Sequence, residues 1–592
     1  MPNYFALVIG LRLLLAIYPP SYIHPDEFFQ SQEVLAGIVY GTKVYIPWEF
    51  QAKANGPPPS RTIVTPGITS GSSFSLLSFF STLFNAPGLI NGRTMLYAPR
   101  LCMIILTLSV DLIILSICTN TDSTTSKPKH DSSSIAKYLL ATSWVATSYF
   151  PRPFSNTCEL ISLACSFGIL LNYEPGNQRS MALGCILAIG TFTRFTFVVF
   201  FLPLGIALLF QHDALYIRQF HRKLKDEDYS STISRNTNKT NRFKGIGDVI
   251  VYGFIGAFST SALFVTIDSM YFGRFTIAPL NNALYNMDSS NLAEHGLHPR
   301  WLHVVVNMHV LFGPLAILTY IIMIIRISTC LTGCNKRDRI RNSINSNKRR
   351  RITSLIDSTT GTINVNLLCM LCIASGLGFL SLAPHQEARF LLPLLVPIII
   401  VCSSFLKQIE TNVANNVSKT NAPMKPCYYS FLFVTFIFNF ILLLLFGIFH
   451  QGGLIRSILH LEHLKNYNRN DHGNAFSYRA YFYKTHMPPR FMLSNYGSPG
   501  DAGFCEVIDL KGAGIDILKQ KMIKGSSSII YENKIKTLVI APKSVHLELD
   551  KALSNCLTLQ TSFWPHLSME DLPSSISDLE LQVFEQSDIC RF

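Results

Sequence analysis

The sequence predicts an all-α polytopic membrane protein. Of its 592 residues, 48% are hydrophobic and only 15% are charged, whereas soluble proteins carry about a quarter charged residues. The mean hydropathy is +0.28. Unbroken apolar runs such as residues 428–449 are long enough to cross a hydrocarbon core of about 30 Å as a helix. The composition therefore excludes a purely soluble protein.

Apolar runs bounded by polar or Pro/Gly-rich segments predict about eleven transmembrane helices. They lie near residues 5–19, 100–118, 137–150, 159–171, 181–193, 195–210, 249–271, 303–326, 364–382, 390–406 and 428–449. Several are shorter than the roughly 20 residues that a perpendicular helix needs. The 137–210 region is therefore expected to contain broken or re-entrant helices. The first span has no basic flank and contains Arg12, which favours a retained anchor over a cleaved signal peptide.

The surplus of positive charge predicts how these helices are oriented. The chain has 50 basic and 36 acidic residues, a net charge of +14. Twelve of these charges lie in three segments, at 336–351 (+7), 213–248 (+3) and 407–425 (+2). Short loops rich in Lys and Arg stay in the cytosol, and eleven spans counted from a cytosolic N-terminus place all three there. The basicity thus indicates orientation and argues against a nucleic-acid partner.

The chain divides into two predicted domains. Residues 1–449 form the multi-spanning domain, and its first luminal loop, 20–99, carries an acidic motif. Residues 450–592 have fifteen residues of each charge and contain strand-like runs such as 537–542. This pattern predicts a small luminal domain of mixed α/β structure.

Five polar clusters fall on the predicted luminal side, at residues 23–31, 151–156, 193–195, 268–301 and 384–390. Because they come from distant parts of the chain and face one compartment, we expect them to form one active site. The first cluster contains the adjacent carboxylates Asp26 and Glu27. Capping of an interfacial helix is one explanation for them, but charges beside a membrane are costly. We therefore expect one of the two to act as a general base.

Cationic side chains in these clusters are candidates for binding a phosphate. The substrate-binding candidates are His24, Arg152, Arg194, His298, Arg300, His385, Glu387 and Arg389. Simpler explanations are an interfacial ion pair for the 385–389 group and snorkelling for Arg152 and Arg194. A metal site at His295, His298 and His303 is disfavoured, because their spacing matches no strong ligand pattern. No metal or other cofactor is expected.

Two long motifs, HPDEFFQSQE at 24–33 and APHQEARFLLPLLVP at 383–397, resemble the dolichyl-phosphate-mannose-dependent α-mannosyltransferases of the endoplasmic reticulum, the glycosyltransferase 22 family. Shorter matches lie at 47–50, 154–156, 268–273, 297–301, 450–453 and 483–490. The basic insertion around 335–354 departs from the family pattern, and little is similar beyond about residue 500.

The resemblance implies a GT-C architecture, an endoplasmic reticulum membrane location and a luminal active site. It also implies dolichyl phosphate mannose as a lipid-linked donor, transfer with inversion, and Asp26 rather than Glu27 as the base. Within the family, the resemblance is greatest to members that add a fourth, α-1,2-linked mannose to the GPI-anchor precursor. Three alternatives stay open: a sibling transferase that adds the third GPI mannose or a lumenal N-glycan mannose, a polytopic transporter, and a non-catalytic scaffold for GPI assembly.

Overall fold

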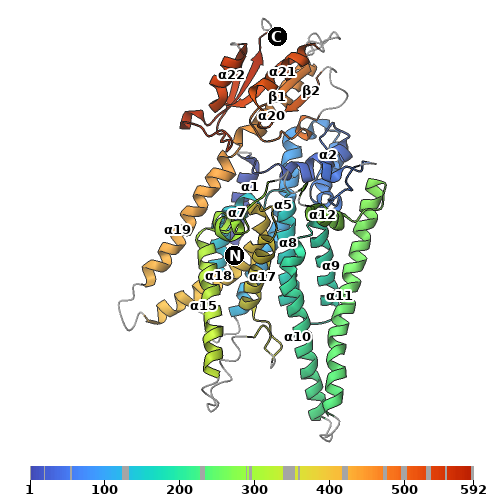
Figure 1. The fold of residues 1–592 in the computed structure, drawn as a ribbon, viewed down its shortest axis with the longest axis vertical. Helices are drawn as coiled ribbons and strands as arrows, with labels where there is room; N and C mark the ends of the chain where they lie inside the picture. Colours follow the sequence, from blue (N-terminus) through green and yellow to red (C-terminus); the bar gives the residue numbers. More distant parts are fainter. Residues whose placement is uncertain are drawn as a thin grey trace.

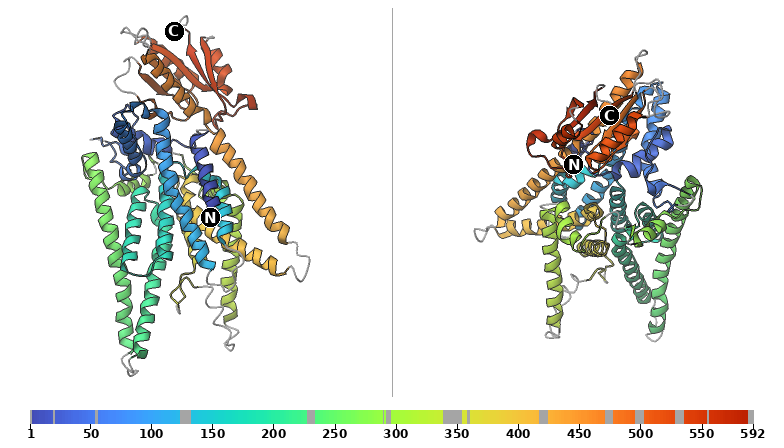
Figure 2. Two further views of the ribbon diagram at one scale, coloured as in Figure 1. Left: turned by 180° about the vertical axis from the view of Figure 1, so that it is seen from behind. Right: turned by 45° about the horizontal axis from the view of Figure 1, so that its top comes forward.

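A bundle of long helices is capped at one end by a small region that contains a β-sheet (Figure 1). The computed structural model describes residues 2–18, 21–53, 56–122, 132–226, 234–288, 290–291, 296–337, 354–357, 360–416, 424–470, 477–494, 503–527, 535–553 and 556–587. The C-terminus lies at the sheet end of the molecule, whereas the N-terminus lies within the helical bundle (Figure 2).

Each of the eleven predicted spans lies largely on a helix. The long helices are α1 (Pro2–Ile17), α5 (Gly92–Asp122), α6 (Ser132–Thr142), α8 (Ser155–Asn172), α9 (Asn177–Thr193), α10 (Phe197–Asp226), α11 (Ser234–Phe272), α15 (Pro314–Arg337), α17 (Val365–Ser381), α18 (Leu395–Asn416) and α19 (Met424–Leu444). The apolar runs therefore predicted the helical segments of the bundle.

Two of the predicted spans are interrupted, and two others change helix type along their length. Residues 137–150 form α6 and the short α7 (Trp144–Ser148), and Ser143 between them caps α7 by accepting the Ala146 N–H. Residues 303–326 form η5 (His303–Asn307), α14 (Met308–Phe312) and α15, with Gly313 at φ 50° between the last two. Similarly, α18 follows the 3₁₀ segment η6 (Ala388–Leu394), and α19 continues into η7 (Leu445–Phe449).

Several helices have the length and composition to cross a membrane. Within the described residues these are Gly92–Asn120, Phe197–Tyr216, Ile246–Phe272, Ala388–Thr411 and Pro426–Phe449. Shorter apolar helices occupy Tyr4–Ile17, His303–Phe312, Pro314–Thr329 and Val365–Ser381. The most apolar stretch of Ala388–Thr411 is 78% buried, whereas that of Ile246–Phe272 is 11% buried. The first therefore lies inside the bundle and the second at its edge; the number of eleven spans stays a prediction.

The segment between α1 and α5, predicted only as a luminal loop, contains several short helices at the sheet end of the bundle (Figures 1 and 2). They are η1 (Phe28–Gln32), α2 (Glu33–Tyr40), η2 (Trp48–Phe50), α3 (Val64–Pro66), η3 (Gly67–Gly71), α4 (Ser72–Leu83) and η4 (Pro87–Leu89). Helix α12 (Ala278–Met287) is held against this segment by hydrogen bonds. Asn281 and Asn282 donate to the carbonyls of Pro59 and Ser60 (2.8 and 3.1 Å).

The C-terminal region has a five-stranded mixed sheet in the order β2-β1-β3-β5-β4. Its elements are α20 (Gly452–Asn470), β1 (Ser477–Phe482), η8 (Phe491–Leu493), β2 (Cys505–Asp509), α21 (Ile515–Ser527), β3 (Ile535–Pro542), η9 (Lys543–Val545), α22 (His546–Ala552), β4 (Leu557–Phe563), η10 (Ile576–Asp578) and β5 (Leu581–Gln586). Strand β1 is parallel to β2 and β3, whereas β5 is antiparallel to β3 and β4.

The two faces of this sheet are buried in different cores, because side chains alternate between the faces of a strand. Ala480 and Phe482 of β1 belong to an apolar cluster that also contains Phe28 and Phe74 from the segment after α1. Tyr481 lies on the other face, in a cluster with residues of α21 and α22. The inner face therefore joins the sheet to the helical end of the molecule.

Candidate active site

The first polar cluster lies in a tight turn between α1 and η1. The Glu27 N–H donates to the His24 carbonyl (3.2 Å), and the Phe28 N–H donates to the Pro25 carbonyl (3.0 Å). Phe28 is fully buried in the core that it shares with the sheet. Buried Phe28 anchors the turn in this core. Glu27 also points into the protein, whereas His24 and Asp26 stay partly exposed.

Glu27 lies in a buried cluster of three charges. One of its oxygens accepts from Nε and Nη2 of Arg100 (2.9 and 2.6 Å), and the other lies 3.2 Å from Arg152 Nε. All three side chains are at most 1% exposed. Arg152 also donates to Ser21 Oγ (2.7 Å). A buried carboxylate held between two guanidinium groups is a structural centre that fixes α5 and the α7–α8 connection to the turn.

Asp26 has different surroundings, although it is the adjacent residue. Its side chain is 19% exposed, forms an ion pair with Arg389, and has one oxygen 3.4 Å from His24 Nδ1. Burial raises the pKa of this carboxyl, but Arg389 and His24 outweigh it and hold the pKa well below its usual range. Asp26 is therefore an ionised and accessible carboxylate.

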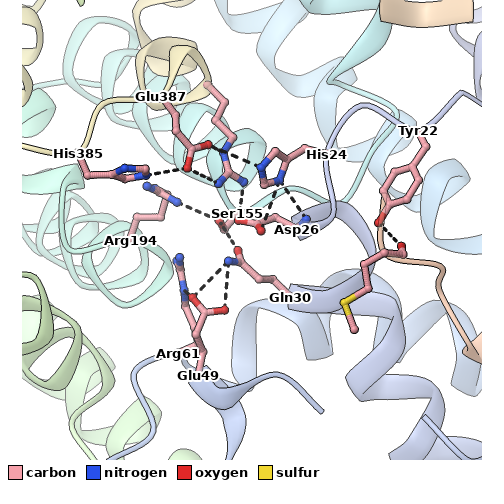
Figure 3. Close-up of polar contacts among 12 residues, drawn as sticks. Tyr22, His24, Asp26, Gln30, Glu49, Arg61, Ser155, Arg194, His385 and Glu387 are labelled. Carbon is pink, nitrogen blue, oxygen red and sulfur yellow. Dashed lines mark hydrogen bonds and ion pairs between the residues drawn. The ribbon is translucent and has the colours of Figure 1, made fainter. Parts of the chain in front are cut away.

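The 384–390 cluster lies directly against Asp26 (Figure 3). Glu387 accepts from Arg389 Nη2 (3.0 Å), and its carboxylate lies 2.9 Å from His385 Nε2 and 3.8 Å from His24 Nε2. Burial raises the pKa of Glu387, but Arg389 and His385 bring it below its usual range. The hydrogen bond to Glu387 in turn raises the pKa of His385. Two carboxylates, one guanidinium and two imidazoles thus form one network.

Arg194 borders this network from the connection between α9 and α10. Its guanidinium lies 4.9 Å from the ring centre of Phe390, within the range of a cation–π contact. Its Nη1 donates to Ser155 Oγ (3.3 Å), and its Nε lies 3.3 Å from Glu159 Oε2. Glu159, inside α8, is a buried partner that the sequence analysis did not identify.

Three further polar residues lie near Asp26: Gln30 belongs to the predicted 23–31 cluster, whereas Glu49 and Arg61 lie outside all five predicted clusters. Gln30 accepts a hydrogen bond from Ser155 and donates to both oxygens of Glu49 (3.3 Å each). Glu49 also accepts from Arg61 Nε (3.0 Å). In Figure 3, the Gln30 side chain lies next to Asp26, and the Glu49–Arg61 pair lies beyond it. The short match at residues 47–50, which contains Glu49, was the available signal, but nothing in the sequence pairs it with Arg61.

The remaining histidine candidates lie beside the 384–390 loop. The His298 N–H donates to the Pro384 carbonyl (2.8 Å), and the His298 ring centre lies 5.5 Å from that of His385. The Arg300 side chain is exposed, and its backbone carbonyl accepts from Gln386 Nε2 (3.4 Å). His303 is buried and hydrogen bonds with Asn307 (2.9 Å). His295 lies outside the described residues. His298 and Arg300 therefore border the loop that carries His385.

Comparison with known proteins gives two kinds of similarity. The chain is 29% identical to GPI alpha-1,2-mannosyltransferase 4 of Homo sapiens over 587 residues, covering 95% of this chain and 88% of that one. It is 27% identical to GPI mannosyltransferase 4 of Saccharomyces cerevisiae over 579 residues, covering 93% and 90%. Among solved structures, ArnT from Cupriavidus metallidurans bound to undecaprenyl phosphate is 8% identical, with a TM-score of 0.46 over 98% of this chain and 97% of that one.

A family model also matches most of the chain, and the matched range includes every described candidate. The model of the Alg9-like mannosyltransferase family matches residues 3–493, from α1 to the end of η8. This range contains the turn at Asp26, the 384–390 loop and the Glu49–Arg61 pair. The chain therefore belongs to the Alg9-like mannosyltransferase family.

Proposed function

We propose that this protein transfers mannose from dolichyl phosphate mannose to the third mannose of the GPI-anchor precursor, forming an α-1,2-linked fourth mannose. Membership of a mannosyltransferase family and the names of relatives that match over most of the chain support this proposal. They also argue against the transporter and scaffold alternatives. A sibling transferase acting on another mannose acceptor is the nearest competing function.

The observation that carries the proposal is the ionised Asp26 carboxylate paired with Arg389, which shares Glu387 with His385. In the proposed reaction, the 2-hydroxyl oxygen of the acceptor attacks the anomeric carbon of the donor mannose. The hydroxyl proton passes to Asp26, which acts as general base. The bond between the anomeric carbon and the phosphate oxygen breaks, and its electron pair stays on the phosphate. Attack from the opposite face inverts the β-linked donor to an α-linked product.

Cationic side chains of the protein would stabilise the leaving lipid phosphate. Arg389 pairs with Asp26, His385 and Arg389 both contact Glu387, and Arg194 lies over the neighbouring Phe390 ring. Guanidinium groups bind phosphate through paired hydrogen bonds. Charge that develops on the leaving group is thus met by fixed positive groups. The proposal therefore includes no metal or other cofactor.

Arg389 would take part both in proton removal and in stabilising the leaving phosphate. It forms ion pairs with Asp26, the proposed base, and with Glu387. Without substrate, it keeps Asp26 ionised. A phosphate that attracts the guanidinium would weaken its contact with Asp26, and burial would then raise the pKa of that carboxyl. In this proposal, donor binding makes Asp26 a stronger base.

We further propose a GT-C architecture with the site at the luminal face of the endoplasmic reticulum membrane. Both substrates are anchored in lipid, so their sugars meet close to the membrane surface. The orientation predicted by the three basic segments places residues 20–99 and 450–592 on the luminal side. In the structure, both of these segments lie at the same end of the bundle (Figures 1 and 2).

The direct test supplies microsomes that contain the protein with dolichyl phosphate mannose and a GPI precursor bearing three mannoses. A precursor with four mannoses, whose new residue is released by an α-1,2-specific mannosidase, is the expected product. Transfer only to a different mannose acceptor would overturn the fourth-mannose assignment. Failure to use any mannose acceptor would overturn the transferase proposal.

A further inference from the structure

A pocket lined by both polar and apolar side chains lies near Asp26, and the proposed reaction does not use it. Its lining includes Gln30, Arg61, Thr62, Thr65, Ser155 and Thr193. Gln30 lies about one helical turn after Asp26, and Figure 3 shows its side chain between Asp26 and the Glu49–Arg61 pair. The pocket is therefore adjacent to the carboxylate on which the reaction is proposed to occur.

A continuous chain of hydrogen bonds passes through Ser155 and Gln30, two of the residues that line the pocket. Arg194 donates to Ser155 (3.3 Å), Ser155 donates to Gln30 (3.3 Å), and Gln30 donates to Glu49 (3.3 Å). Arg61 donates to the same carboxylate through Nε (3.0 Å). Within the described residues, Nη1 and Nη2 of Arg61 have no protein acceptor. The chain thus fixes the amide and hydroxyl groups and leaves two guanidinium nitrogens available to a ligand.

Another part of the lining is held in place by α11. Asp268 accepts from Thr62 Oγ1 and from the Ile63 N–H (2.9 Å each), so this buried carboxylate fixes the start of α3. Thr65, in α3, has its hydroxyl 3.0 Å from that of Thr193 at the end of α9. Hydroxyl groups from two distant segments therefore lie together at the pocket.

The chemistry of these walls fits a neutral polyol better than an anion. Glu49 and Arg61 compensate each other, and the carboxylate would repel a phosphate, whereas Arg389 and His385 on the other side of Asp26 would attract one. Sugar hydroxyls both donate and accept, as do the amide and hydroxyl groups present here. Phe50 adds an apolar surface for the face of a sugar ring.

We propose that this pocket binds a neutral hexopyranose ring of one substrate, with Arg61, Gln30 and Thr65 contacting its hydroxyl groups. The inference depends on the proposed function, because it identifies a sugar subsite of that reaction. Two sources share this chemistry, namely the mannose of the lipid donor and the terminal mannose of the acceptor. In either case, the pocket would hold one ring while its reacting atom faces Asp26.

The test measures KM for each substrate with the other at saturation, using the full-length protein in detergent with dolichyl phosphate mannose and the three-mannose precursor. In the double variant Glu49→Gln/Arg61→Gln, KM for one substrate is expected to rise about tenfold or more, because hydrogen bonds from a charged donor are lost. A rise for the lipid donor assigns the pocket to the donor mannose. A rise for the precursor assigns it to the acceptor mannose.

The matched control is Arg479→Gln/Glu506→Gln, which removes an ion pair of similar geometry (2.7 Å) between β1 and β2. It should leave both KM values unchanged. Thr65→Val provides a second test that keeps the side-chain shape and removes only the hydroxyl. Its KM should rise for the same substrate, and Thr65→Ser should restore most of the affinity, which a purely structural role would not predict.

The inference would be overturned if folded Thr65→Val and folded Glu49→Gln/Arg61→Gln both kept wild-type KM values for both substrates. The proposed function would still hold in that case, because these variants would transfer mannose normally. If the double variant does not fold, the KM values of Thr65→Val and Thr65→Ser decide whether the inference holds. A wild-type protein that transfers no mannose would instead overturn the proposed function and this inference together.

Discussion

At the scale of single residues, Asp26→Asn and Glu27→Gln are expected to impair the protein in different ways. Asp26→Asn removes the proposed base, so kcat should fall about 100-fold to 10,000-fold, while the thermal midpoint in detergent stays close to that of the wild type. Glu27→Gln leaves Arg100 and Arg152 buried without a counter-charge, a change that costs about 3–5 kcal/mol. Its thermal midpoint and folded yield should therefore fall. Equal loss of stability in both variants would contradict this assignment.

A second residue-scale prediction concerns pH. Because the hydrogen bond to Glu387 raises the pKa of His385, the cationic imidazole persists to higher pH and is lost as pH rises through that pKa. The pKa of Asp26 is lowered, so we expect no acidic limb in kcat/KM between about pH 5 and 7. In Glu387→Gln the basic limb should move to lower pH. The measurement is kcat/KM from pH 5 to 9, and His385→Gln, which should lack this limb, is the control.

The two adjacent carboxylates also show what a sequence can reveal about a site. Motif and charge pointed to Asp26, Glu27 and the 385–389 cluster. The structure brings Asp26 and the 385–389 cluster together, whereas Glu27 pairs with Arg100 and Arg152 instead. The difference between the two carboxylates depends on Arg100, 73 positions away from Glu27, and Arg100 lies inside an apolar run. Long-range pairs such as Glu49–Arg61 leave no periodic pattern, so residue types alone did not identify them.

At the scale of elements, helix positions in the bundle were predictable because apolar runs define them, and the short helices of residues 28–89 were not. The latter contain polar groups that are buried only by partners elsewhere in the chain. Glu33, for example, accepts the N–H groups of Tyr45, Arg490 and Phe491 (2.9, 3.0 and 3.1 Å). Such contacts fix α2 through residues near 490, which no local pattern indicates.

The packing of α9 against α11 gives an element-scale prediction. A Cβ added at Gly256 would lie 2.0 Å from the Met181 carbonyl oxygen, whereas one at Gly253 would meet only the Ser180 carbonyl oxygen at 3.7 Å. Small residues allow such close helix packing. Gly256→Ala should therefore separate the helices, shift Asp268 and lower the thermal midpoint by several degrees.

Gly253→Ala is the matched control in the same helix. Alanine favours a helix over glycine by about 1 kcal/mol, and no clash opposes it at this position, so its midpoint should equal or exceed that of the wild type. The measurement is thermal unfolding in detergent, together with transferase activity. Two variants with the same midpoint would show that this close approach does not determine the stability of the pair.

At the scale of the whole molecule, the C-terminal sheet and the segment that carries Asp26 share one apolar core. Phe482 of β1 is fully buried in the cluster that contains Phe28, two residues after Asp26. Leu518 of α21 is equally buried, but in the cluster on the outer face of the sheet. The predicted boundary at residue 449 therefore separates segments whose side chains pack together, and the inner face of the sheet supports the turn at Asp26.

Because of this shared core, two cavity-forming substitutions that lower the stability by a similar amount are predicted to affect activity differently. Phe482→Ala and Leu518→Ala should each destabilise the protein by about 2–5 kcal/mol. Phe482→Ala should also lower kcat/KM at temperatures well below its midpoint, because the cavity loosens the packing of Phe28 and hence the position of Asp26. Leu518→Ala should keep wild-type kcat/KM under the same conditions, because its cavity opens towards α21 and α22. Thermal unfolding and steady-state kinetics on both variants provide the check. Equal kcat/KM in the two folded variants would mean that the sheet stabilises the molecule without positioning the base.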